Sequence, residues 1–252
     1  MKVIINAELV EHQQSAMTES GWLVGSRIFE TIKTIDAKPW AFSRHMRRAV
    51  SAARREQIPM PEEEVVRNAV SILLAAESLQ SGVLRISFSK SGDWGAAHLP
   101  YSENSRAARI ETYPEIVAAS GVMFKSFPYD HRLNILEKSR SRGFDEALLI
   151  NSNGKVCEGA VTNVVLKIAG IWVTPPLSDG VLPGIMRALV IENTEVTVRS
   201  IVAAEIEKVE AAFLLSSLRI AQPVASIDGR ELVQSHDFKE QIEALALRTS
   251  VD

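Results

Sequence analysis

The sequence predicts an α+β protein of two domains, and three features indicate it. Residues 26–35 alternate apolar and polar side chains, which is typical of a strand with one face buried. Helices are expected over 43–56, with Ser43 as N-cap, and from Pro61, where acidic residues fill the first turn. The Asn-Gly pair at 153–154 predicts a β-hairpin, because both residue types tolerate positive φ.

The other elements follow from runs of apolar residues bounded by Gly, Pro, Asn or Asp. The best boundary between domains is 114–120, which separates an α+β block from a new β run. We therefore expect a small N-terminal α+β domain over 1–113, a linker over 114–120 and a larger domain over 121–252. Strands are expected over 1–5, 82–89, 109–113, 121–124, 145–151, 161–168, 171–173, 196–200 and 212–216, and helices over 134–142, after Pro183, over 203–209 and from 237.

Composition excludes several classes of protein. The net charge of −3 gives no general attraction to nucleic acid, so no nucleic-acid partner is expected. The single cysteine, Cys157, leaves no internal disulfide and fits a reducing compartment. No secretory signal and no apolar run of membrane-spanning length is visible, and no metal-ligand pattern stands out. The chain is expected to be cytoplasmic, with no membrane partner.

Two features in the second half of the chain need a chemical explanation. Glu158 lies in a β meander, where a glutamate is otherwise read as a surface residue. The segment Gly184-Ile185-Met186 begins a helix, and helix N-termini bind anions through free N–H groups. Gly-x-Gly and P-loop patterns are absent, so a nucleotide is not the favoured anion.

At this point the chain resembles the class IV pyridoxal-phosphate aminotransferases, which include branched-chain and D-amino-acid aminotransferases and aminodeoxychorismate lyase. Seven matching segments occur in family order across nearly the whole chain. They are FETI at 29–32, HMRR at 45–48, DEALLIN at 145–151, G-x-V-x-E-G-x-x-x-N at 154–163, TPPL at 174–177, GVLPGIMR at 180–187 and SSLRIAQPV at 216–224.

The resemblance implies fold type IV, with pyridoxal 5′-phosphate (PLP) in the cleft between the two domains and the larger C-terminal domain as the main cofactor-binding domain. The chemistry requires a lysine that forms a Schiff base with the cofactor. Lys138 lies on a charged helix, and Lys155 lies in a hairpin turn that is expected to be exposed. Lys125 stands 20 residues before Asp145 and 33 before Glu158, which matches the family spacing. We therefore choose Lys125, although the residues that follow it depart from the family's small residues and Asn.

The resemblance also assigns roles around the cofactor. A carboxylate beside the pyridine nitrogen keeps that nitrogen protonated, and Glu158 matches this position. An arginine suits the phosphate because its charged donors form paired hydrogen bonds. The implied cofactor contacts are Arg48, the amides of Ile185 and Met186 and the hydroxyl of Ser217 for the phosphate, Tyr129 for the ring oxygen, and Asn163 as support.

Substrate recognition is expected from the N-terminal half, with Phe29, Thr31, Arg85 and Arg27 as the substrate-binding residues. Arg85 matches a carboxylate-contacting arginine of branched-chain enzymes, and Arg27 replaces a glycine of many relatives near the Phe29-Glu30 pair. Thr31 is more typical of the lyases, as is the short chain. Three activities stay open: transfer of an amino group between an amino acid and a 2-oxo acid, cleavage of 4-amino-4-deoxychorismate to pyruvate and 4-aminobenzoate, and a catalytically inactive relative. The family further implies a homodimer.

Overall fold

The computed structural model describes residues 1–25, 27–113, 123–127 and 129–249; of Arg27, it describes only the main chain. The chain divides into two compact units. The first unit comprises Met1–Glu103, Phe124–Pro128 and Thr249–Asp252, and the second comprises Asn104–Met123 and Tyr129–Arg248. This division falls between Glu103 and Asn104, whereas the expected linker at 114–120 lies outside the described residues.

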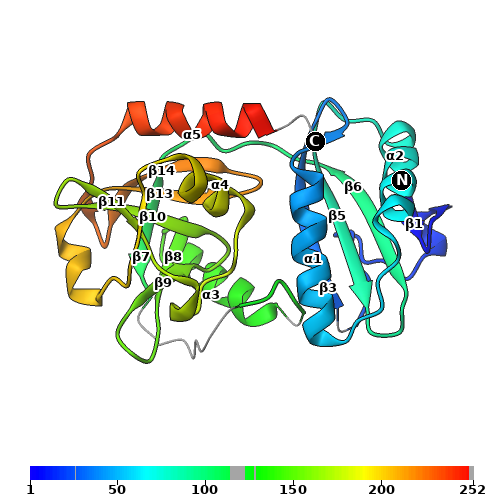
Figure 1. Ribbon diagram of the computed structural model, residues 1–252, viewed down its shortest axis with the longest axis horizontal. Coiled ribbons are helices and arrows are strands. Elements are labelled where there is room, and N and C mark those ends of the chain that lie inside the picture. The colour runs from blue at the N-terminus through cyan, green and yellow to red at the C-terminus, as the bar shows by residue number, and fades with distance from the viewer. Residues whose placement is uncertain (26, 114–122, 128, 250–252) are drawn as a thin grey trace. The chain divides into compact units, whose positions relative to one another are not determined.

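A six-stranded sheet forms the centre of the first unit, with strand order β2-β1-β6-β5-β3-β4 (Figure 1). The neighbouring strands in this order pair antiparallel. The strands are β1 (Lys2–Ile5), β2 (Glu8–Glu11), β3 (Arg27–Ile35), β4 (Lys38–Pro39), β5 (Ser81–Ser89) and β6 (Trp94–Pro100).

Two helices, α1 (Phe42–Glu56) and α2 (Glu63–Ala76), pack on this sheet (Figure 1). Their buried residues recur at helical spacing and join the sheet in one hydrophobic core. The expected N-cap Ser43 is wrong: α1 begins at Phe42, and its N-cap is Ala41, whose φ of 52° turns the chain into the helix. Strand β3 also differs from expectation, because burial extends over both of its faces as far as Thr34.

The second unit contains a nine-stranded sheet in the described part of the chain, with order β12-β11-β10-β13-β14-β7-β8-β9 and β15 beside β14. Strand β7 pairs parallel with both β14 and β8. The predicted Asn-Gly hairpin joins β8 to β9, and these two strands pair antiparallel. The strands are β7 (Ala108–Thr112), β8 (Glu146–Ile150), β9 (Val156–Gly159), β10 (Asn163–Ile168), β11 (Ile171–Thr174), β12 (Thr197–Val198), β13 (Val209–Ser216), β14 (Ile220–Ile227) and β15 (Arg230–Glu231).

Three α-helices accompany this sheet: α3 (Asp130–Ser141), α4 (Ile185–Asn193) and α5 (His236–Thr249). Helix α3 starts four residues earlier than expected and ends before Gly143, whose φ of 90° suits the predicted glycine there. The ring of Phe238 on α5 stacks on Trp172 with centroids 4.1 Å apart. Helix α5 thereby covers part of β11.

Three further expectations need correction. The predicted strand over 121–124 is not confirmed, because residues 123–125 have no strand conformation and 121–122 lie outside the described residues. The predicted strand over 196–200 shrinks to the two residues of β12. Strands β2, β4, β6, β14 and β15 were not predicted from the sequence.

Candidate active site

The central feature of the second unit is the buried carboxylate of Glu158, the third residue of β9, which is 5% exposed. Its Oε2 accepts hydrogen bonds from the side-chain amide of Asn163 at 2.8 Å and from the main-chain N–H of Leu182 at 2.9 Å. Its Oε1 lies 3.1 Å from Nη2 of Arg132. A buried carboxylate with a cation and two neutral donors around it is held in one orientation.

The start of helix α4 lies directly beside this carboxylate. Asn163 also donates to the carbonyl oxygen of Leu182 at 3.0 Å, so it ties the segment before α4 to Glu158. The N-cap is Gly184, and a Cβ there would stand 1.8 Å from Asn163 Oδ1. Ile185 and Met186 are buried in the first turn, where no side chain caps the helix. The first N–H groups of a helix have no partner within it, so this turn can bind an anion.

Sequence reasoning missed Arg132. Its guanidinium is buried, and besides Glu158 it contacts the carbonyl oxygen of Gly159, to which Nη1 donates at 3.2 Å. The buried positions of α3 are Arg132, Ile135, Leu136 and Ser139, which is the spacing of one helix face. That spacing was available in the sequence, but a helix expected only from residue 134 left Arg132 outside the pattern.

Lys125 belongs to the first unit and is half-buried. Its carbonyl oxygen accepts a hydrogen bond from the N–H of Phe29 at 3.0 Å, and its Nζ lies 4.7 Å from the centre of the Phe29 ring. Ser126 forms a bridge with Ile28, which fixes the segment along β3. The charge of Lys125 also contributes to lowering the pKa of His45, although burial is the largest cause of that shift.

Arg48 lies on α1 and pairs with the buried carboxylate of Glu30 on β3. Burial by itself raises the pKa of Glu30, but the charge of Arg48 and hydrogen bonds from His45 and Arg48 overcome burial and lower this pKa to about 2. Burial also lowers the pKa of His45, so its imidazole is neutral near pH 7. Glu30 is a second residue that sequence reasoning missed, although the alternation of β3 places it between the buried Ile28 and Ile32.

The expected substrate residues of the first unit share one surface of the sheet. Thr31 stands directly opposite Arg85 in the β3–β5 pair, and Phe29 lies two residues away along the same strand face. The Arg85 guanidinium lies over the ring of Trp22 at 4.7 Å and donates to the carbonyl oxygen of Ser20. Burial lowers the pKa of Arg85. The side chain of Arg27 lies outside the described atoms; its main chain pairs with Ser89.

Two further expected cofactor contacts lie in the second unit. Tyr129 is half-buried at the start of α3, and its hydroxyl donates a long hydrogen bond of 3.5 Å to the carbonyl oxygen of Ala160. Ser217 is half-buried in the turn between β13 and β14. Arg219 in that turn lies 3.4 Å from the buried carboxylate of Glu146. Burial raises the pKa of Glu146.

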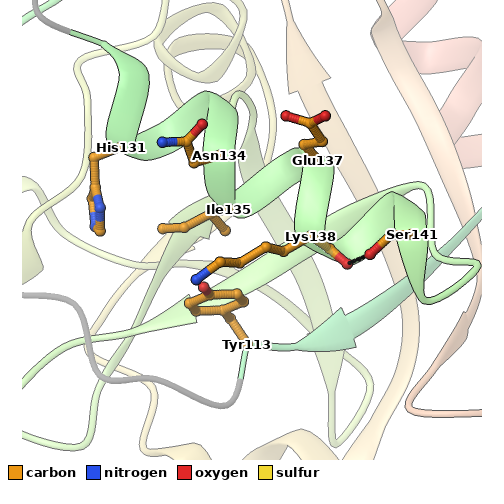
Figure 2. Close-up of a pocket in the computed structure, with 7 residues that line it drawn as sticks. All are labelled: Tyr113, His131, Asn134, Ile135, Glu137, Lys138 and Ser141. Atoms are coloured by element: carbon orange, nitrogen blue, oxygen red, sulfur yellow. Dashed lines mark hydrogen bonds between the residues drawn. The ribbon is translucent and has the colours of Figure 1, made fainter.

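The two competing lysines lie elsewhere in the second unit. Lys155 is half-buried rather than exposed, because its segment forms a bridge with Val202. Lys138 lines an open hollow of about 530 Å³ on one side of α3, and Figure 2 shows its side chain extending toward Tyr113. The sequence-predicted site residues are absent from the lining of this hollow, which consists of Tyr113, His131, Asn134, Ile135, Glu137, Lys138 and Ser141.

No helix within residues 1–25, 27–113, 123–127 and 129–249 is both long enough and apolar enough to cross a bilayer. The same residues hold no group of three or more His, Cys, Asp or Glu side chains placed to bind a metal ion.

Solved structures share the fold. A branched-chain aminotransferase from Thermoproteus uzoniensis superposes with a TM-score of 0.86 at 24% identity, covering 99% of this chain and 95% of its own. A branched-chain amino acid aminotransferase from Escherichia coli gives 0.82 at 20% identity, covering 96% and 91%. The fold is therefore that of the fold type IV PLP enzymes.

Sequence comparison places the chain within that class. The family model for class IV amino-transferases matches residues 27–227. A bifunctional aminodeoxychorismate lyase / D-amino acid transaminase from Mycobacterium tuberculosis is 22% identical over 246 residues, covering 82% of this chain and 84% of that protein. The chain belongs to the class IV aminotransferase family, whose members are PLP-dependent enzymes.

Proposed function

We propose that this chain is a PLP-dependent aminotransferase that moves an amino group between an amino acid and a 2-oxo acid. The observation that carries the proposal is the direct link between Glu158 and the start of α4. Hydrogen bonds from Asn163 and Leu182 join a buried carboxylate to a helix N-terminus whose glycine N-cap has room for no side chain. A carboxylate suits the protonated ring nitrogen of PLP, and a helix N-terminus suits its phosphate.

The chemistry of Glu158 and of the first turn of α4 suits this cofactor, and every further residue has a distinct role in the proposal. PLP, when bound, supplies an electron sink that stabilises negative charge at the α-carbon of the substrate. Lys125 would hold the cofactor through its Nζ, and the same amine would move the proton at the α-carbon of the substrate as general base and acid. Glu158 holds the proton of the ring nitrogen, and Asn163 fixes Glu158. The phosphate and ring-oxygen contacts are Arg48, the amides of Ile185 and Met186, Ser217 and Tyr129.

The substrate contacts in this proposal are Phe29, Thr31, Arg85 and Arg27. Phe29, Thr31 and Arg85 are supported by their common face on the β3–β5 pair. An arginine on that face recognises a carboxylate, the group that amino acids and 2-oxo acids have in common. Arg27 is included from the sequence alone.

The test is an amino-acid panel with 2-oxoglutarate or pyruvate as acceptor, using protein loaded with PLP. The proposal expects at least one amino acid to be consumed while its 2-oxo acid and a new amino acid appear in equal amounts. The Lys125→Ala variant is the control and should form neither product. If no amino acid in the panel is converted by the wild-type protein, aminotransfer is excluded.

A second candidate is the lyase reaction, which Thr31 favours because a threonine after Phe29-Glu30 resembles the lyases. In this reaction the same lysine would assist elimination of pyruvate, and Thr31 would assist proton transfer. Incubation with 4-amino-4-deoxychorismate separates the two activities. Prompt release of pyruvate and 4-aminobenzoate supports the lyase, and the absence of both products excludes it.

We also propose a homodimer, on the family resemblance alone. Light scattering on the purified protein should give twice the 27.7 kDa mass of the chain. A mass equal to that of one chain would contradict the dimer.

A further inference from the structure

A carboxylate inside the hydrophobic core of the first unit has no role in the mechanism above. Glu30 lies in β3 between Ile28 and Ile32, both of which belong to the core that α1 and α2 share with the sheet. Only 1% of Glu30 is exposed. Burying an ionised carboxylate is costly unless its charge is balanced and its oxygens accept hydrogen bonds. The presence of a glutamate at this buried position therefore calls for a functional explanation.

The partners of Glu30 both come from α1. The Nε–H of Arg48 donates to Oε1 at 2.9 Å, and Nη2 of Arg48 donates to Oε2 at 2.5 Å. Nδ1 of His45 lies 2.7 Å from Oε2 and donates to it, because an ionised carboxylate can only accept. Residues 45 and 48 are one helical turn apart and so face β3 together. The arrangement is a two-point fork on Arg48 braced by a neutral histidine.

This fork constrains the guanidinium of Arg48. A guanidinium carries five N–H donors in one plane, and Glu30 takes two of them. Two contacts to one rigid carboxylate fix that plane and remove the rotamer freedom that a long arginine side chain otherwise keeps. The Arg48 side chain is 11% exposed, so the group is held at the edge of the core.

We propose that Glu30 is a positioning residue for phosphate recognition, which holds the Arg48 guanidinium in the orientation that binds the 5′-phosphate of PLP, with His45 bracing the carboxylate. The proposal rests on the proposed function, because it requires that Arg48 contacts the phosphate. Charge alone would give the opposite effect, because the negative carboxylate of Glu30 repels the phosphate.

The test compares two probes that differ only in the phosphate: PLP and pyridoxal. Dissociation constants for both are measured by equilibrium dialysis on the wild-type protein and on Glu30→Gln, which keeps the size of the side chain. The preference for PLP over pyridoxal should fall by about tenfold in E30Q, the value of one charge-assisted hydrogen bond, while pyridoxal binding stays the same. In an Arg48→Ala background, E30Q should cause no further loss of preference.

The outcomes are distinct. A preference that is unchanged or increased in E30Q overturns the positioning role and leaves the proposed function intact. If the wild-type protein binds neither probe, the proposed function fails and this inference fails with it. Should E30Q not fold, Glu30→Asp gives the same test, because it keeps the negative charge but is one methylene too short to form the two-point fork with Arg48. An unchanged preference for PLP in E30D would then overturn the proposal.

Discussion

The side-chain amide of Asn163 donates to Oε2 of Glu158 at 2.8 Å, and the same nitrogen donates to the carbonyl oxygen of Leu182 at 3.0 Å. One residue at the start of β10 therefore joins the carboxylate of β9 to the segment that leads into α4. This link makes the orientation of Glu158 depend on a neutral neighbour as well as on Arg132.

Replacing Asn163 with alanine should cost about 1–3 kcal/mol of unfolding free energy, because it leaves a buried carboxylate oxygen and a carbonyl with fewer donors. It should also weaken PLP binding. Chemical denaturation and equilibrium dialysis measure the two effects. Asn193→Ala is the matched control, since Asn193 makes a hydrogen bond of 2.8 Å to Leu189 on an exposed part of α4. Equal losses in both variants would contradict the account.

Gly184→Ala should destabilise the protein for a purely steric reason. The φ of Gly184 is −70°, which alanine adopts freely, but the new Cβ would stand 1.8 Å from Asn163 Oδ1. We expect a loss of about 2 kcal/mol by chemical denaturation, as for other overpacked sites. The loss should shrink clearly when Gly184→Ala is made in the Asn163→Ala background. A full loss in both backgrounds would show that Asn163 is not the obstacle.

Arg132→Met should cost roughly 3 kcal/mol or more, because it leaves the buried charge of Glu158 without its cation. The double variant with Glu158→Gln should recover part of this loss, since it removes the uncompensated charge as well. Arg142→Met is the control: Arg142 pairs with Glu111, but its side chain is 40% exposed, so its loss should be about 1 kcal/mol or less. If the double variant is no more stable than Arg132→Met alone, the two residues are not coupled.

The stability of the protein should depend on Glu30 in acid. The pKa of Glu30 is about 2 in the folded chain against an ordinary value of 4.5, so its contribution is present above pH 4.5 and is lost as the pH falls toward 2. The difference corresponds to about 3 kcal/mol. In E30Q the fall in unfolding free energy between pH 4.5 and 2 should be smaller by about this amount. The groups that set the shift are Arg48 and His45, which face Glu30 from α1.

A matched control for the acid titration is Glu205→Gln. The pKa of Glu205 is also lowered, first by a hydrogen bond from Arg199, but in a more exposed position. Glu205→Gln should change the fall in unfolding free energy between pH 4.5 and 2 less than E30Q does. Identical pH profiles for wild type and E30Q, each measured by urea denaturation, would show that folding does not lower the pKa of Glu30.

Much of the fold followed from apolar periodicity, but several strands did not. For β6 and β14 the physical reasons are visible in the sequence. The segment of β6, WGAAHLP, has three small residues in a row, Gly95 to Ala97, and lacks alternation. Strand β14 contains Pro223, which argues against a central strand, yet β7 pairs with β14 only from Val224 onward. Its first residue, Ile220, has a φ of 57°, which no apolar pattern predicts for a β-branched residue.

The candidate site, too, could be predicted from the sequence only in part. Family spacing pointed to Lys125 and Glu158, and the sequence pattern marked the start of α4 as an anion site. The residues that orient these groups were missed, because their importance lies in their burial. Glu30 and Arg132 are ordinary charged residues in the sequence, and only the packing of α1 on β3 and of α3 near β9 gives each a buried partner.

The most direct test of the account is to find which lysine carries the cofactor. Protein loaded with PLP is reduced with borohydride, digested and analysed by mass spectrometry. The account predicts a phosphopyridoxyl label on the peptide that contains Lys125 and none in Lys125→Ala. A label on Lys138 or Lys155, or no label in the wild-type protein, would contradict it.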